Sequence, residues 1–210
     1  MVEFVDLPTE KKIIEWHDII PLKTINYSSP KLLMCPRIPR PLHGTAPRNI
    51  LTQIDKDWWD RTRHKVYEAN NLHCMCCGVH KTKQGGYKKW LDAHELYSID
   101  YRTGTVRLEY IVALCRDCHA GIHFGRLTEE FKKGNIRESE FRRVISHANT
   151  VLDEAGLPPK NWDVTVNDNL SGNVPWKDWK LILNINGEDV EFHSQWESEE
   201  EQNEYYANKQ

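Results

Sequence analysis

The sequence predicts an α+β protein built around a small zinc-stapled unit of strand, turn, strand and helix. Two aliphatic runs with strand character precede a helical pattern, two C-x2-C pairs flank this stretch, and further helical and hairpin patterns lie outside it. The 210 residues include eight tryptophans, and 39% are hydrophobic and 28% charged. This is a globular composition, and it excludes a wholly disordered chain.

Residues 1–52 are expected to form an irregular N-terminal arm. A short helix is predicted over Thr9–Ile19, and the stretch CPRIPRPLHGTAPR contains four prolines, which favour extended backbone over helix. We expect this arm to lie over the core rather than to form a core of its own. After the arm, apolar residues spaced three and four apart predict a helix over Asp55–Ala69, with its tryptophans in the core.

The unit at 53–126 carries the central strands. Trp90–Leu96 and Val106–Leu114 have the aliphatic content of strands, and Arg102–Gly104 supplies a turn between them. A helix then runs from the second cysteine pair to about Phe124. Because so small a unit cannot bury an adequate core of its own, zinc would supply the missing stability.

Two further segments follow this unit. Residues 127–160 are predicted to be a helical extension, with an amphipathic helix over Glu138–Ala155 that ends at a glycine followed closely by two prolines. Residues 161–210 are predicted to hold a C-terminal β-hairpin and an acidic tail. The hairpin rests on alternating apolar residues around Asn186-Gly187, the dipeptide that most favours a two-residue turn. We expect the tail to be helical or disordered.

Four of the six cysteines have the spacing of a zinc site. Cys74 and Cys77 form one C-x2-C pair, and Cys115 and Cys118 form a second pair after 37 intervening residues. Two such pairs can close a tetrahedron of thiolates around one structural Zn²⁺. The N-terminus lacks the features of a secretory signal, so a disulfide framework is not expected. The remaining Cys35 and Cys76 are interpreted as small buried residues.

The charge is unevenly distributed along the chain. Residues 37–89 contain eleven Lys and Arg against four acids, a local charge of +7, whereas residues 188–210 contain eight acids and one lysine, a local charge of −7. This pattern suggests a polyanion-binding surface and a tail that repels polyanions or shields that surface. A solvated face and a frayed end would explain the charges equally well. The candidate nucleic-acid-binding residues are Arg61, Arg63, Lys65, Lys81, Lys83, Lys88 and Lys89.

Three histidines are placed where a second metal ion could be held. His119 and His123 are four residues apart on the predicted helix and therefore project from one face. His94 lies on the first strand, which the hairpin turns toward that helix. Together they can form a three-imidazole site with open positions for water and a phosphate.

At LDAHEL and LCRDCHAGIHFGR the sequence resembles the HNH, or ββα-metal, nuclease superfamily, and the resemblance extends over about residues 74–126. More loosely, it resembles uncharacterised bacterial and phage HNH-like proteins. The resemblance implies a ββα-metal core in which His94, His119 and His123 bind one catalytic divalent metal, Mg²⁺, Mn²⁺, Ni²⁺ or Zn²⁺. The spacing is similar to that in the nuclease domain of colicin toxins.

Two positions depart from the family pattern. The histidine that serves as general base in the family corresponds to Glu95, and the orienting asparagine corresponds to Tyr110. An unperturbed glutamate, with a pKa of about 4.3, is a weaker base than imidazole, but burial would raise that pKa. Glu95 is therefore interpreted as the base or as a metal ligand. The alternatives are His80 as base, or His94 as base with Asp92 on the metal.

The leading functional hypothesis is a metal-dependent endonuclease acting on DNA, most simply double-stranded DNA. The alternatives are a catalytically degenerate nucleic-acid-binding or partner-inhibiting module, with the acidic tail as a protein-binding surface, and a scaffold in which both sites are closed and structural. With no secretory signal and no run of eighteen apolar residues, we expect a cytoplasmic protein of a bacterium or phage-infected cell, with no membrane association.

Overall fold

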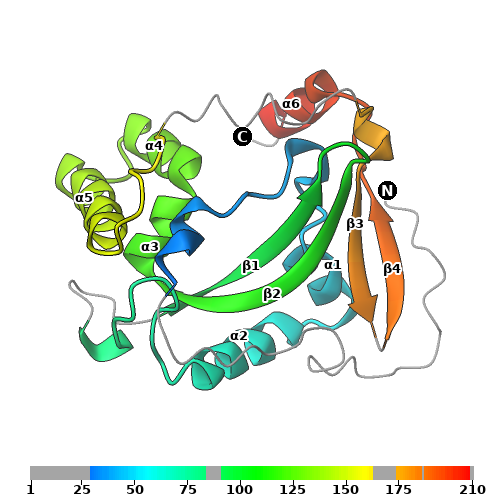
Figure 1. The fold of residues 1–210 in the computed structure, drawn as a ribbon. Helices are drawn as coiled ribbons and strands as arrows, with labels where there is room; N and C mark the ends of the chain where they lie inside the picture. Colours follow the sequence, from blue (N-terminus) through cyan, green and yellow to red (C-terminus); the bar gives the residue numbers. More distant parts are fainter. Residues whose placement is uncertain (1–28, 84–90, 163–173, 186, 209–210) are drawn as a thin grey trace.

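A computed structural model of the chain describes residues 29–83, 91–162, 174–185 and 187–208. Within this part the fold is α+β, with six α-helices and a four-stranded mixed sheet (Figure 1). Four predicted features lie outside the described residues: the helix Thr9–Ile19, the basic side chains of Lys88 and Lys89, the start of the first strand at Trp90, and Asn186 of the predicted turn. None of the described helices is long and apolar enough to cross a membrane.

The predicted central hairpin is present. Strands β1 (Leu91–Asp100) and β2 (Thr105–Cys115) pair antiparallel, with a register shift between Leu96 and Tyr97. Gly104 closes the turn with a φ of +68°, a conformation that disfavours a side chain. A continuous buried run from Ile111 to Leu114 indicates that both faces of β2 are covered near its end.

The C-terminal hairpin is also present, and it joins the central one. Strand β3 (Lys180–Ile185) pairs antiparallel with β4 (Glu188–His193), as the Asn-Gly turn predicts. The sequence did not predict that β3 would also pair in parallel with the start of β2, giving the strand order β1-β2-β3-β4. This pairing buries Leu181 and Leu183 completely, and the apolar burial stabilises it.

The helices agree with the predicted ones except near the arm and after β2. The predicted helix over 55–69 begins at Trp58, and an unpredicted helix precedes it, with Pro47 at its first position, where a proline fits. The helix after β2 ends at Ile122, and a separate helix follows His123. The six helices are α1 (Pro47–Ile54), α2 (Trp58–Ala69), α3 (Arg116–Ile122), α4 (Phe124–Lys132), α5 (Glu138–Glu154) and α6 (Glu199–Ala207).

The arm contributes side chains to the same core as the strands. Leu33, Leu42 and Leu51 are at most 1% exposed and belong to the same hydrophobic cluster as the strands. Leu33 and Leu42 lie on two short 3₁₀ helices, Pro30–Met34 and Arg40–Leu42, and Leu51 lies on α1. In Figure 1, α3, α4 and α5 gather at one end of the central hairpin and β3–β4 at the other.

Candidate metal centres

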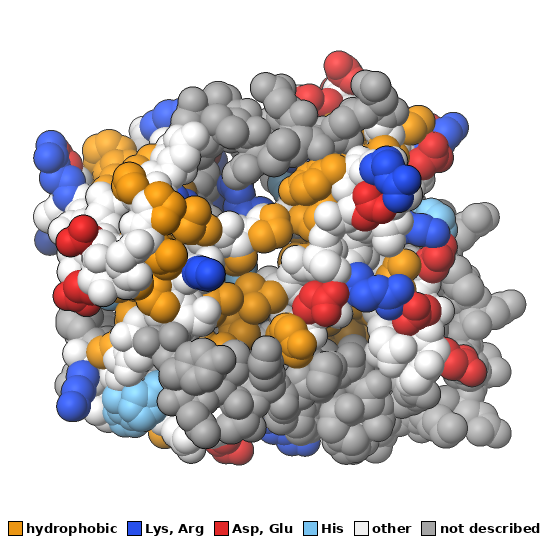
Figure 2. All heavy atoms as spheres, in the orientation of Figure 1, with side chains coloured by type: hydrophobic (Ala, Val, Ile, Leu, Met, Phe, Trp, Pro, Cys, Tyr) orange, Lys and Arg blue, Asp and Glu red, His pale blue; other side chains and the backbone are white. Residues whose placement is uncertain are grey.

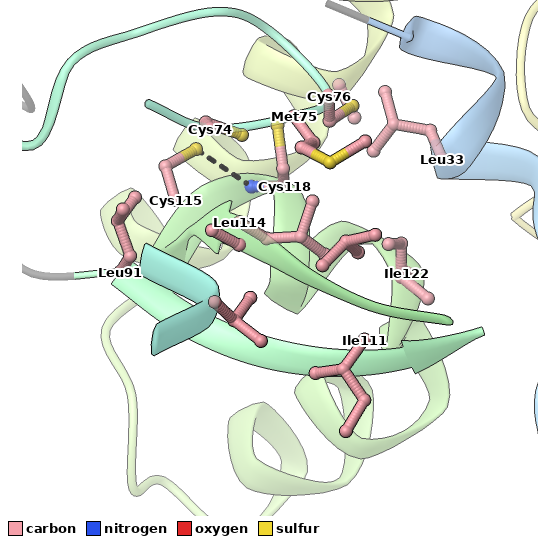
Figure 3. Packing of buried hydrophobic residues seen from close by; sticks show 14 of the residues in the cluster. Leu33, Cys74, Met75, Cys76, Leu91, Ile111, Leu114, Cys115, Cys118 and Ile122 are labelled. Atoms are coloured by element: carbon pink, nitrogen blue, oxygen red, sulfur yellow. Dashed lines mark hydrogen bonds between the residues drawn. The ribbon is translucent and has the colours of Figure 1, made fainter. Parts of the chain in front are cut away.

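The four predicted zinc ligands come together at the end of β2. Cys74 and Cys77 lie in the loop after α2, where Gly78 has a φ of +73° and the amide of Met75 donates to the carbonyl of Ala113 on β2 at 2.8 Å. Cys115 ends β2, and Cys118 lies in the first turn of α3. The Cys118 amide donates to Cys115 Sγ at 3.4 Å (Figure 3).

The spacing of these sulfurs fits a zinc ion. All four Sγ atoms lie within 4.8 Å of one another, and none is in a disulfide. The Sγ atoms of Cys77 and Cys115 are 3.8 Å apart. Zn–S bonds of about 2.3 Å at tetrahedral angles place sulfurs about 3.8 Å apart. Hydrogen bonds from Cys115 and Cys118 lower the pKa of the Cys77 thiol, so at least this residue favours the thiolate that a metal needs.

One residue beside this site was missed by the sequence reasoning. His147 on α5 places Nε2 3.2 Å from Cys118 Sγ and 3.8 Å from Cys115 Sγ. A hydrogen bond to Cys77 raises the pKa of His147. An available signal was that His147 shares a helix face with the buried Val144 and Val151, where a polar side chain needs a partner. The imidazole therefore links α5 to the cysteine cluster.

The three predicted histidines also come together. His94 on β1 is 4% exposed, His119 lies in α3, and His123 is the C-cap residue that directly follows α3. Their candidate ligand nitrogens lie within 4.8 Å of one another, and Nε2 of His123 is 3.1 Å from Nδ1 of His94. Two imidazoles on one ion, with metal–nitrogen bonds of about 2.1 Å, would have their nitrogens about 3.0–3.4 Å apart. The group could therefore hold a metal ion.

The protonation states of these rings suit metal binding. Burial lowers the pKa of His94 well below its ordinary value of 6.5, and the nearby His123 and His119 lower it further. Burial also lowers the pKa of His123 to about 3, with help from His119 and Arg126. Both rings are consequently neutral near pH 7, the form in which imidazole binds a metal.

Groups behind the histidines orient two of the rings. Nδ1 of His119 lies 3.3 Å from Oδ2 of Asp92, so the carboxylate can accept its hydrogen. Nε2 of His94 lies 3.8 Å from Sγ of Cys35, and burial keeps that thiol protonated by raising its pKa to about 11. Contacts of this kind fix which ring nitrogen is free for a metal. Cys35 is thus only partly buried and has a specific neighbour, whereas Cys76 is fully buried as expected.

A cavity of about 870 Å³ opens at the histidine cluster and includes His94, His123 and Glu95 in its lining. Burial raises the pKa of Glu95, opposed in part by His119 and Arg48. The raised pKa makes this carboxylate a stronger base than an exposed glutamate. In Figure 2 the molecule is hollowed near the centre of this face, between the positions of α4 and α6 in Figure 1, with hydrophobic side chains around the hollow.

The cations that line the cavity beside the histidines belong to the basic segment 37–89, but they are not among the candidate nucleic-acid-binding residues named from it. Arg37 and Arg40 of the arm line the cavity, and Arg37 and Arg126 help to lower the pKa of His123. The signal available in the sequence was the run of arginines between the prolines of the arm. Of the predicted set, Arg61 and Arg63 form ion pairs with aspartates of the same region.

The other described residues of the predicted sites lie outside the cavity lining. Lys65 lies on α2, and Lys81 and Lys83 lie on a short 3₁₀ helix (Lys81–Lys83). His80 hydrogen-bonds Thr82, and Tyr110 pairs with Leu96 in the hairpin. His80 is therefore absent from the histidine group among the described residues.

Comparison of the chain with protein-family models, curated proteins and solved structures finds no match.

Proposed function

We propose that this protein is a metal-dependent endonuclease that hydrolyses phosphodiester bonds in DNA. The observation that carries the proposal is the convergence of three imidazoles from β1 and α3, two of them in the lining of a cavity that also contains Glu95. Metal-assisted hydrolysis needs ligands with an open side and a base nearby, and this arrangement offers both. The HNH resemblance supports the same chemistry, since the order β1, β2, α3 is the order it implies.

In this proposal His94, His119 and His123 hold the ion, and Asp92 and Cys35 keep two of the rings oriented. A bound divalent metal, Mg²⁺, Mn²⁺, Ni²⁺ or Zn²⁺, would neutralise charge on the scissile phosphate and stabilise the leaving oxygen. The cysteine cluster with structural zinc keeps the start of α3 fixed against the end of β2, and so fixes His119 relative to His94.

Glu95 is the proposed general base. It follows His94 on β1 and lines the same cavity, and its raised pKa favours proton acceptance from a water molecule. If Glu95 has this role, Glu95→Gln reduces the rate at pH 7 without reducing metal binding. A Glu95→Gln variant that cleaves as fast as the wild type would assign the base elsewhere.

The proposal is tested by cleavage of supercoiled plasmid and of single-stranded circular DNA with Mg²⁺, Mn²⁺, Ni²⁺ or EDTA. We expect metal-dependent cleavage of at least one of these substrates, which His119→Ala reduces by more than about 100-fold. His193→Ala is the matched control, because His193 lies on β4 with a side chain that is 59% exposed. Absence of cleavage of both substrates with every metal, or full activity in His119→Ala, would refute the proposal.

A second candidate is a nucleic-acid-binding or partner-inhibiting module without cleavage. It is favoured by the contact between Glu199 of the acidic helix α6 and Arg40 in the cavity wall, which places a carboxylate where a phosphate would otherwise bind. The acidic tail would then be the surface that a protein partner recognises. Salt-sensitive retention of DNA without cleavage would support this candidate over the first.

A further inference from the structure

The cavity at the histidine cluster is walled by elements that lie outside the hairpin-and-helix unit. On one side are arm residues 36–46, and on another are Trp176 and residues of α6, including Glu199 and Asn203. Without these walls the histidines would lie on an open surface that a duplex could approach. With them, part of the surface of His94 and His123 faces a bounded space.

The arm and the C-terminal segment that wall the cavity are joined by several hydrogen bonds, so the walls are a fixed part of the fold. Arg40 also forms an ion pair with Glu199 and donates to Asn203 Oδ1 at 3.0 Å. The bonds to arm carbonyls run from Ser194 Oγ to Pro41 (2.6 Å), from Trp196 Nε1 to His43 (3.0 Å) and from the buried Gln202 Nε2 to Arg40 (2.9 Å).

We infer that the substrate of this site is single-stranded DNA, bound as an extended strand whose unstacked bases lie in the cavity, and that intact duplex is a poor substrate. The inference rests on the proposed function for its chemistry, but the binding step can be tested alone. A cavity of about 870 Å³ is of the size that encloses a drug-sized ligand, roughly one or two nucleotides. In a duplex, the bases beside each phosphate are paired with a second strand. The arm and α6 would obstruct the approach of that second strand.

The cavity has the side chains of a stacking site. Tyr97, Tyr101 and Trp176 are partly exposed and line it. Aromatic side chains bind bases of single strands by stacking, with little dependence on sequence. The guanidinium carbon of Arg40 lies over the Trp176 ring, 5.9 Å from its centre, so one face of this ring already carries a cation.

The charges of the cavity also favour one strand over two. Arg37 has no ion pair among the residues that the structure describes, and it is available for a phosphate. Three glutamates, Glu95, Glu129 and Glu199, line the same space. A surface that binds duplex through its phosphates needs a strong excess of cations. Mixed charge with aromatic walls instead suits binding in which stacking contributes much of the affinity.

The binding test uses fluorescence anisotropy with a short labelled oligothymidine and with a hairpin duplex of similar length, without added divalent metal. We expect the single strand to bind at least about tenfold more tightly. Trp176→Ala should weaken its binding by about 5- to 150-fold, the range for loss of one stacked base. Tyr206→Ala is the control, because Tyr206 is an aromatic residue of α6 that is 43% exposed and outside the cavity lining. Equal binding of both probes, or equal loss in both variants, would overturn the inference.

The cleavage test separates this inference from the proposed function. With Mn²⁺, the wild type should cut the single strand at least about tenfold faster than the duplex, and His119→Ala should cut neither. Cleavage of duplex as fast as single strand, dependent on His119, would overturn the inference and leave the nuclease in place. Binding of the single strand through Trp176 without cleavage by any metal would overturn the proposed function and leave the binding site.

Discussion

A zinc ion held by the cysteine cluster would stabilise the protein, and the length of chain between the cysteine pairs gives the expected size of the loss when the ion is removed. Cys77 and Cys115 lie 38 residues apart in the sequence and 3.8 Å apart at their sulfurs. In the loop-closure model used for disulfides, a link across a loop of this length lowers the conformational entropy of the unfolded chain and raises the free energy of unfolding by about 4 kcal/mol. We apply the same model to a link through a metal ion. Because domains are typically stable by only about 5–15 kcal/mol, this loss is a large fraction of the total.

The assay is urea unfolding followed by tryptophan fluorescence, with and without a zinc chelator. Chelation should lower the free energy of unfolding of the wild type by about 4 kcal/mol. Cys118→Ser, which removes a fully buried ligand, should unfold at low urea and respond much less to the chelator. Cys76→Ser is the matched control, since Cys76 is equally buried but outside the cluster. It should lose about 1–3 kcal/mol from the buried hydroxyl and keep its response to the chelator.

A wild-type unfolding curve that the chelator does not move would contradict a metal ion shared by the four cysteines. A shift of Cys118→Ser by the chelator as large as that of the wild type would contradict it too. In either case the four sulfurs would be packed together without sharing a metal, and the stability of this end of the hairpin would come from apolar burial alone.

Three further outcomes follow from particular side chains. His147→Ala should weaken zinc affinity by about 10- to 100-fold, measured by competition with a zinc indicator, because it removes a hydrogen-bond partner of the sulfurs; unchanged affinity would refute this. Since the pKa of His123 is about 3 in the folded protein and 6.5 for a solvated histidine, the unfolded chain binds more protons below pH 6.5. The free energy of unfolding should therefore be highest above that pH and fall by about 2 kcal/mol on going to pH 5 because of this residue alone, and His94 should add a loss of the same sign. Urea midpoints of the wild type and of His123→Asn, both measured without added divalent metal, test this. An equal pH response in the two proteins would contradict it. Leu181→Ala should cost about 2–5 kcal/mol in urea unfolding, since Leu181 is fully buried; a loss below about 1 kcal/mol would show that the C-terminal hairpin contributes little to the core.

The predicted features that agree with the structure depend on residues close together in the chain. The helix Glu138–Glu154 follows from its apolar spacing, and the pairing of β3 with β4 follows from the Asn-Gly turn. The convergence of the cysteines follows from two C-x2-C pairs, and the shared face of His119 and His123 from their spacing of four. In each case a few neighbouring residues determine the geometry through helical or strand periodicity.

Local patterns in the sequence were enough to predict the class of fold and the two groups of side chains that could hold a metal ion. Three contacts appear only in the folded molecule: β3 pairs with β2, the arm's leucines enter the core, and His147 lies against the cysteines. The meeting of the arm and α6 around the histidines is of the same kind. These contacts join residues that are distant in the chain. Each depends on how the whole molecule buries its apolar side chains at once, so no local spacing predicts it.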